Sequence, residues 1–245
     1  MALHEDDAIV LTRHAFRERD WVVVVLARGS GQVRLMARRA RSLRSGQGQS
    51  LEPLAVVRLS YFERHGAELA TLHEVSLIRS GFELAAQPEA WAAAQVVAEL
   101  ALVYCPQGQR AEEPFRLVDH CLQHLASGGD PLATVHYAEL WFLRLSGVLP
   151  ALDRCGRCEV ALPVGPLVFD TGERVCVCSE HRPPAGVVML PEAATTWLRH
   201  ALHARLDSVG AAAPPPAPAW LASLRQQYTD RNLASLPYLL SLLRA

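Results

Sequence analysis

The sequence contains no lysine, so all 24 of its basic residues are arginine. It also lacks an uncharged apolar run of about 18 residues, which a membrane-spanning helix would need. Its first ten residues, MALHEDDAIV, carry acidic side chains where a signal peptide would carry basic ones. We therefore expect a cytoplasmic protein that does not associate with membranes.

The motifs of the common enzyme classes are also absent. The chain has no G-x-S-x-G nucleophile motif, no Walker A motif, no G-x-G-x-x-G after a strand and no H-E-x-x-H. Its ten histidines are scattered. His120 and His124 are four residues apart, but no carboxylate pattern completes a metal site beside them. The sequence therefore predicts a protein that is not an enzyme and has no small-molecule substrate.

The first eighty residues have the pattern of a small barrel. Apolar, β-branched or alternating runs are separated there by charged, Gly or Ser segments, which is typical of short strands. The predicted strands are Ile9–Arg13, Trp21–Arg28, Val33–Arg38, Pro53–Phe62 and Glu68–Leu77. Five strands favour an OB-fold, although an SH3-like barrel fits the same periodicity.

The pattern becomes helical from Pro88 onward, since proline is common at the start of a helix. The predicted helices are Pro88–Tyr104, Ala111–Ala126, Pro131–Leu145, Pro191–Val209, Trp220–Thr229 and Leu233–Arg244. A run of Ala and Pro between Gly210 and Ala219 is typical of an extended surface linker.

Five metal-type residues gather between Asp153 and His181. Cys155 and Cys158 are spaced so that one tight turn presents two thiolates, and Cys176, Cys178 and His181 form a second group. This spacing is close to the C-x2-C-x15–20-C-x2-C pattern of zinc sites. Buried cysteines or disulfides are the alternative, but cysteines in such patterns inside cells are more often metal ligands.

The sequence favours Cys155, Cys158 and Cys176 as three ligands and leaves the fourth open between Cys178 and His181. Four protein ligands leave no open position for a substrate water, so such a zinc ion would be structural. We predict one structural zinc that holds a small hairpin in shape.

Arginines are concentrated near the N-terminus, in a chain whose net charge is only −1. Arg38, Arg39, Arg41 and Arg44 lie in one loop between predicted strands, and Arg34 lies on the adjoining strand. Arginine is well suited to phosphate contacts, so these five residues are candidate DNA-binding residues. Aromatic residues on neighbouring strands could stack bases, although a role in the core is favoured for them; they are Trp21, Tyr61 and Phe62.

The order of these parts resembles the RecO family of DNA repair proteins. The resemblance rests on the segments ARRARS, LEPLAVVRLSYFERHGAELATLHEVSL and LRLSGVLPALDRCGRC, and it covers nearly the whole chain. Two features differ from the family pattern: a glycine usually found near Arg39 is missing, and CVCSEH stands in place of a second Cys-x2-Cys pair.

The predicted fold is a multidomain α+β protein. It has an N-terminal five-stranded β-barrel (OB-fold) at residues 1–80, an α-helical domain at 81–150 and 185–245, and an inserted zinc-binding module at 151–184.

The resemblance also implies a function, that of a non-enzymatic recombination mediator. Such a protein binds single- and double-stranded DNA, anneals complementary strands and works with RecR at the nucleoid. Together they help to load the RecA recombinase onto strands coated by single-strand-binding protein. One competing hypothesis is a zinc-ribbon scaffold for protein partners with little DNA affinity. The other is a zinc hydrolase, which the closed ligand set disfavours.

Overall fold

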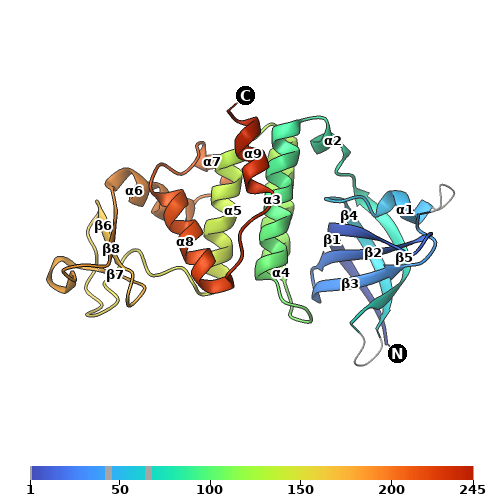
Figure 1. Cartoon of the computed structure of the whole chain (residues 1–245), viewed down its shortest axis with the longest axis horizontal. Coiled ribbons are helices and arrows are strands. Elements are labelled where there is room, and N and C mark those ends of the chain that lie inside the picture. Colours follow the sequence, from blue (N-terminus) through green and yellow to red (C-terminus); the bar gives the residue numbers. More distant parts are fainter. Residues whose placement is uncertain (1, 42–45, 64–67, 245) are drawn as a thin grey trace. The chain divides into compact units, whose positions relative to one another are not determined.

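The computed structural model describes residues 2–41, 46–63 and 68–244 (Figure 1). The chain forms two compact units. The first combines Met1–Gly128 with Leu233–Ala245, and the second is Gly129–Asn232. Among the described residues, no helix is both long and apolar enough to span a bilayer.

The first unit contains a closed five-stranded barrel whose strands run in the spatial order β1-β2-β3-β5-β4. The strands are β1 (Ala2–Phe16), β2 (Asp20–Ala27), β3 (Gly31–Ala37), β4 (Val56–Glu63) and β5 (Ala70–Arg79). All neighbouring pairs are antiparallel except β3 and β5, which pair in parallel. This topology is that of an OB-fold, so the tertiary structure decides against the SH3-like alternative.

Strand β1 closes the barrel because it is long enough to pair twice. Residues 2–9 pair with β4 and residues 8–16 pair with β2, with an irregularity between Val10 and Thr12. The sequence predicted only Ile9–Arg13 as a strand. Residues 2–7 are mostly polar and none of them is buried, so apolar periodicity could not reveal them.

The barrel interior is apolar. Val23 and Val25 of β2 point inward together with Leu35 of β3 and Leu59 and Tyr61 of β4, and all five are buried. This follows from strand geometry, in which every second side chain faces the same side.

The remaining elements of the first unit are helical. They are α1 (Gly46–Ser50), α2 (Phe82–Ala85), α3 (Pro88–Tyr104), α4 (Glu112–Ala126) and α9 (Leu236–Leu242). Helices α3 and α9 lie side by side (Figure 1). The carboxylate of Glu99 on α3 accepts hydrogen bonds from the N–H groups of Ala234 and Ser235, just before α9 begins.

The loop between α3 and α4 reaches the barrel at Gly31. This residue has a φ of 72°, and a Cβ there would lie 2.1 Å from the carbonyl oxygen of Gln109. Only glycine fits such a close approach. The same residue follows the tight turn between β2 and β3 and is the first residue of β3.

The second unit combines helices with a small antiparallel sheet of order β7-β6-β8. Its elements are α5 (Pro131–Leu145), β6 (Leu167–Asp170), β7 (Val175–Val177), the 3-10 helix η1 (Ser179–His181), β8 (Val187–Leu190), α6 (Glu192–Ala201), α7 (Leu206–Val209) and α8 (Ala217–Thr229). Helices α5 and α8 lie side by side (Figure 1). Between them, Glu139 and Arg225 form a buried ion pair with an N–O distance of 2.7 Å.

The Ala-Pro segment is not a free surface linker. Ala213 and Ala217 are buried, and the N–H of Ala213 donates a hydrogen bond to Nδ1 of the buried His136. The segment therefore packs against α5, a partner that its composition could not reveal. The three predicted domain ranges, 1–80, 81–150 with 185–245, and 151–184, remain a proposal about which segments fold together.

Candidate nucleic-acid interface and metal centre

The candidate DNA-binding loop is joined to the turn between β1 and β2. The N–H of Arg41 donates to the carbonyl of Arg19 at 3.0 Å, and its guanidinium donates to the carbonyl of Arg17 at 2.9 Å. The N–H of Arg39 donates to the carboxylate of Asp20 at 2.8 Å. Two segments about twenty residues apart in the sequence thus form one surface.

We call this surface the basic end of the barrel. It comprises Arg13, Arg17, Arg19, Arg38, Arg39 and Arg41. All of these except the partly exposed Arg13 are exposed. The sequence singled out Arg38, Arg39 and Arg41. The other three could not be assigned, because only the barrel brings the β1–β2 turn beside the loop that follows β3.

Trp21 lies between the barrel core and two arginines of the basic end. Its indole ring packs against the barrel core, and the guanidinium carbons of Arg13 and Arg41 lie 4.8 and 5.2 Å from the ring centroid. These are cation–π distances. Tyr61 is buried, and Phe62 is half-buried against His73. The interpretation of these aromatics as core residues is therefore confirmed for Tyr61, whereas Trp21 both packs on the core and orients two arginines.

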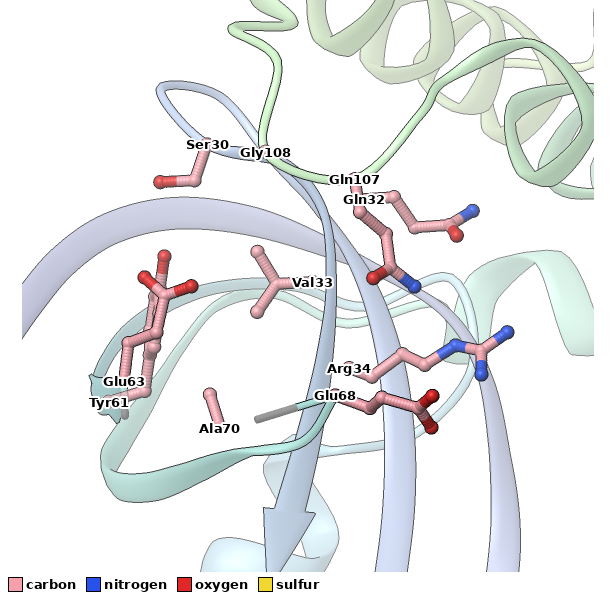
Figure 2. A pocket seen from close by; sticks show the side chains of 10 residues that line it. All are labelled: Ser30, Gln32, Val33, Arg34, Tyr61, Glu63, Glu68, Ala70, Gln107 and Gly108. Carbon is pink, nitrogen blue, oxygen red and sulfur yellow. The ribbon is translucent and has the colours of Figure 1, made fainter. Parts of the chain in front are cut away.

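Arg34 lies apart from the basic end. It is in the middle of β3, opposite Val24, and lines a small pocket together with Glu68 and Gln107 (Figure 2). The pocket volume is about 80 Å³. Arg44, the fifth candidate residue, lies outside the described residues.

The metal-type residues come from two turns in the second unit. In the first turn, the N–H of Cys155 donates to the carbonyl of Val160 at 2.8 Å, and Glu159 has a φ of 61°. This turn presents Cys155 and Cys158 together. In the second turn, Cys178 precedes the 3-10 helix that ends at His181, and the N–H of His181 donates to the carbonyl of Cys178.

The two turns bring four ligand atoms together. The sulfurs of Cys155, Cys158 and Cys178 and a ring nitrogen of His181 all lie within 4.8 Å of one another. The Cys158 and Cys178 sulfurs are 3.9 Å apart, and Nδ1 of His181 lies 3.9 Å from the Cys155 sulfur and 3.2 Å from the Cys178 sulfur. In a tetrahedral zinc site the ligand atoms are roughly 3.5–3.8 Å apart. The Cys3His group could therefore hold a metal ion.

Cys176, which the sequence favoured as a ligand, is not in this group. It lies in β7 opposite Phe169, its side chain is buried, and burial raises the pKa of its thiol to about 12. Cys178 lies after the end of β7, where the chain turns, so its sulfur points to the first turn instead. The open choice between Cys178 and His181 is also resolved, since both belong to the group. The regular spacing Cys-x2-Cys and Cys-x2-His was the signal for this set.

The pKa of the Cys155 thiol is shifted in the opposite direction to that of Cys176. Burial by itself raises the pKa of the Cys155 thiol, but backbone N–H donors, that of Cys178 foremost, outweigh it and leave this pKa lowered. A lowered pKa favours the thiolate, which is the form that binds metal ions.

Arg199 of α6 positions the first turn. Its guanidinium donates two hydrogen bonds to the carbonyl of Leu152 and one to that of Pro163. These carbonyls flank the segment that carries Cys155 and Cys158. The sequence offered no signal for this role, because the partners are 36 and 47 positions apart in the sequence and only the fold brings them together.

The fold and these sites define a class of protein. Its members have an OB-fold barrel with an arginine-rich end, and a second, largely helical unit in which two turns present a Cys3His group. Comparison with known proteins finds one family along most of the chain. The family description "Recombination protein O N terminal" matches residues 1–81, and "Recombination protein O C terminal" matches residues 85–240.

Individual proteins that are similar to this chain belong to the same family. The DNA repair protein RecO of Anaeromyxobacter dehalogenans (strain 2CP-C) is 33% identical over 240 residues, 94% of this chain and 93% of the relative. That of Anaeromyxobacter sp. (strain K) is 34% identical over 171 residues, covering 70% and 67%. That of Streptomyces coelicolor is 29% identical over 201 residues, covering 79% and 80%. The chain belongs to the RecO family, and its role lies in DNA repair by recombination.

Proposed function

We propose that the chain is a non-enzymatic recombination mediator that binds single- and double-stranded DNA through the basic end of its barrel. The observation that carries this proposal is the gathering of six arginines from β1, the β1–β2 turn and the loop after β3. Guanidinium groups bind phosphate oxygens well because their donors form a planar fork. Contacts of this kind position a nucleic acid without reading its sequence.

Phosphate binding at this surface has two consequences. Each phosphate that is neutralised releases counterions, so the affinity should fall steeply with salt concentration and depend little on base sequence. A protein that holds strands by their backbones also leaves the base edges free to pair. This supports a role in annealing complementary strands, a reaction that needs no nucleotide.

The proposed partners are those that the resemblance to the RecO family implies. Within a recombination pathway, the protein would act with RecR at the nucleoid and help to load RecA onto strands coated by single-strand-binding protein. The proposed mediator makes and breaks no covalent bonds.

The metal of the Cys3His group would be zinc. Three thiolates and one imidazole form a soft donor set that suits zinc in a tetrahedral structural site. Cys155, Cys158, Cys178 and His181 would hold the ion and thereby join the two turns. Because all four positions are filled by protein, the ion would stabilise this part of the second unit and take no part in chemistry.

The test measures DNA binding by fluorescence anisotropy across a salt titration. The ligands are a mixed-sequence single-stranded oligonucleotide and a duplex. We expect the triple variant Arg38→Gln, Arg39→Gln, Arg41→Gln to bind both more weakly. Each lost phosphate contact should lower the log–log salt slope by about 0.7 for single strands and about 0.9 for duplex.

The matched control removes three exposed arginines elsewhere, in the variant Arg116→Gln, Arg205→Gln, Arg231→Gln. It has the same net charge as the first variant. An equal loss of affinity in both would show that only net charge matters. A wild-type protein that fails to bind DNA at low salt would favour the protein-scaffold hypothesis.

A further inference from the structure

The six cysteines differ in their access to solvent. Cys158 is exposed and Cys178 is half-buried. The other four, Cys105, Cys121, Cys155 and Cys176, are buried. The Cys3His group therefore has one ligand that a dissolved oxidant can reach directly, at the edge of a cluster of sulfurs.

The exposed sulfur also has a close partner. The Cys158 and Cys178 sulfurs are 3.9 Å apart, and a disulfide bond is about 2.05 Å long. The two residues belong to different turns, so a movement of about 2 Å by one turn would bring the sulfurs to bonding distance. A thiolate bound to a metal ion is deprotonated, which is the form that reacts with peroxides.

We propose that Cys158 and Cys178 form an oxidation site, at which hydrogen peroxide converts the two thiolate ligands into a disulfide and releases the metal ion. This inference rests on the proposed occupancy of the Cys3His group by zinc. It adds a reactive role to residues whose proposed role so far is structural.

Hydrogen peroxide oxidises the two thiolates in two steps. The Cys158 thiolate attacks one oxygen of hydrogen peroxide, the O–O bond breaks, and hydroxide leaves as the sulfenic acid forms. The Cys178 thiolate then attacks the Cys158 sulfur, the S–O bond breaks, and a second hydroxide leaves. The two sulfurs lose two electrons in total and the peroxide gains two. Cys155 and His181 remain as ligands, too few to retain zinc in a structural site.

The buried cysteines act as internal references. Burial raises the pKa of the Cys105 thiol to about 12 and raises that of Cys121 further still. Both are therefore neutral thiols that peroxide cannot reach, and they should stay reduced. The barrel contains no cysteine in its described strands, so the basic end should keep its DNA affinity while the metal is released.

The experiment uses the full-length protein purified with zinc. The metal content is measured first by native mass spectrometry. Hydrogen peroxide is then added while a chromogenic chelator reports released zinc, and disulfides are mapped by peptide mass spectrometry. We expect one zinc ion released per disulfide, a disulfide between Cys158 and Cys178, and recovery on adding thiol reductant and zinc.

Two variants sharpen this test. Cys158→His removes the exposed thiol but retains a possible ligand, and zinc release should slow by at least about tenfold. Cys121→Ser removes a buried thiol and should release zinc at the wild-type rate. If Cys158→His binds no zinc, disulfide mapping of the wild type decides the assignment.

The outcomes separate the two proposals. A protein without zinc before peroxide is added would overturn the metal assignment itself. Zinc that is present but survives peroxide, or a disulfide that maps to a different pair, would overturn the oxidation site and leave the metal assignment standing.

Discussion

The two compact units are stabilised in different ways. Eight polar or charged residues are buried in the described chain, and six of them lie in the second unit. These six are Thr134, His136, Glu139, Asp170, Thr195 and Arg225. The barrel of the first unit instead has an apolar core and carries its arginines on the surface.

This difference predicts different sensitivities. Apolar burial depends little on pH or on metal ions, whereas a buried polar group is stable only with its partner. The barrel should therefore tolerate changes to its functional arginines. The second unit should lose stability whenever a buried polar group or a metal ligand loses its interaction partner.

Removal of the metal should have the largest effect. Structural zinc contributes roughly 10–16 kcal/mol of binding free energy in small zinc domains. Chelation, or Cys155→Ser, should abolish amide protection across residues 153–182 in hydrogen exchange. Protection of strands β1–β5 should not change. Equal loss in both units, or loss in neither, would contradict the proposed division.

Breaking the buried ion pair should come next. In Glu139→Leu the Arg225 guanidinium stays buried, and among the described residues it keeps the carbonyl of Arg231 as its hydrogen-bond partner. An uncompensated buried charge costs about 3–5 kcal/mol. Urea unfolding of the second unit should show this loss, and the double variant Glu139→Leu, Arg225→Met should recover most of it. A single variant as stable as wild type would disprove the importance of the pair.

Acid should weaken the second unit through His136. Burial lowers its pKa from 6.5 to about 4, and the nearby Asp130 opposes this only in part. The unfolded state therefore binds the proton first, so stability falls as the pH drops from 6.5 towards 4. The loss should reach about 3 kcal/mol.

Urea unfolding at pH 7 and pH 4.5 would measure this effect. His136→Gln retains an acceptor for the Ala213 N–H but does not titrate. It should show a smaller pH dependence than the wild type, and an unchanged dependence would assign the effect to other groups.

The smallest effect is expected at Arg34. Because it lies away from the basic end, Arg34→Gln should change DNA affinity less than Arg39→Gln does, and both should leave stability within about 0.5 kcal/mol of wild type. Anisotropy and thermal unfolding test this. A larger loss of affinity at Arg34 would place the DNA path across β3.

Much of the architecture could be predicted from local patterns. Alternating apolar residues predicted five strands, and Pro88 with its Ala-rich sequence predicted α3, because these signals act within a few residues. The first half of β1 was missed, since its residues are polar on a strand that is exposed there. The short helices α1 and α2 were missed as well, because five and four residues are too few to show a period.

The sequence by itself determined the family, the five metal-type residues and the arginines of one loop. Only the tertiary structure decided that Cys178 and His181 join Cys155 and Cys158 while Cys176 packs inside a strand. It also placed Arg17 and Arg19 beside Arg41. The physical reason is the same in both cases. Spacing restricts which residues can meet, but the direction of a side chain at the end of a strand, and the strand that lies next to it, depend on how the whole unit packs.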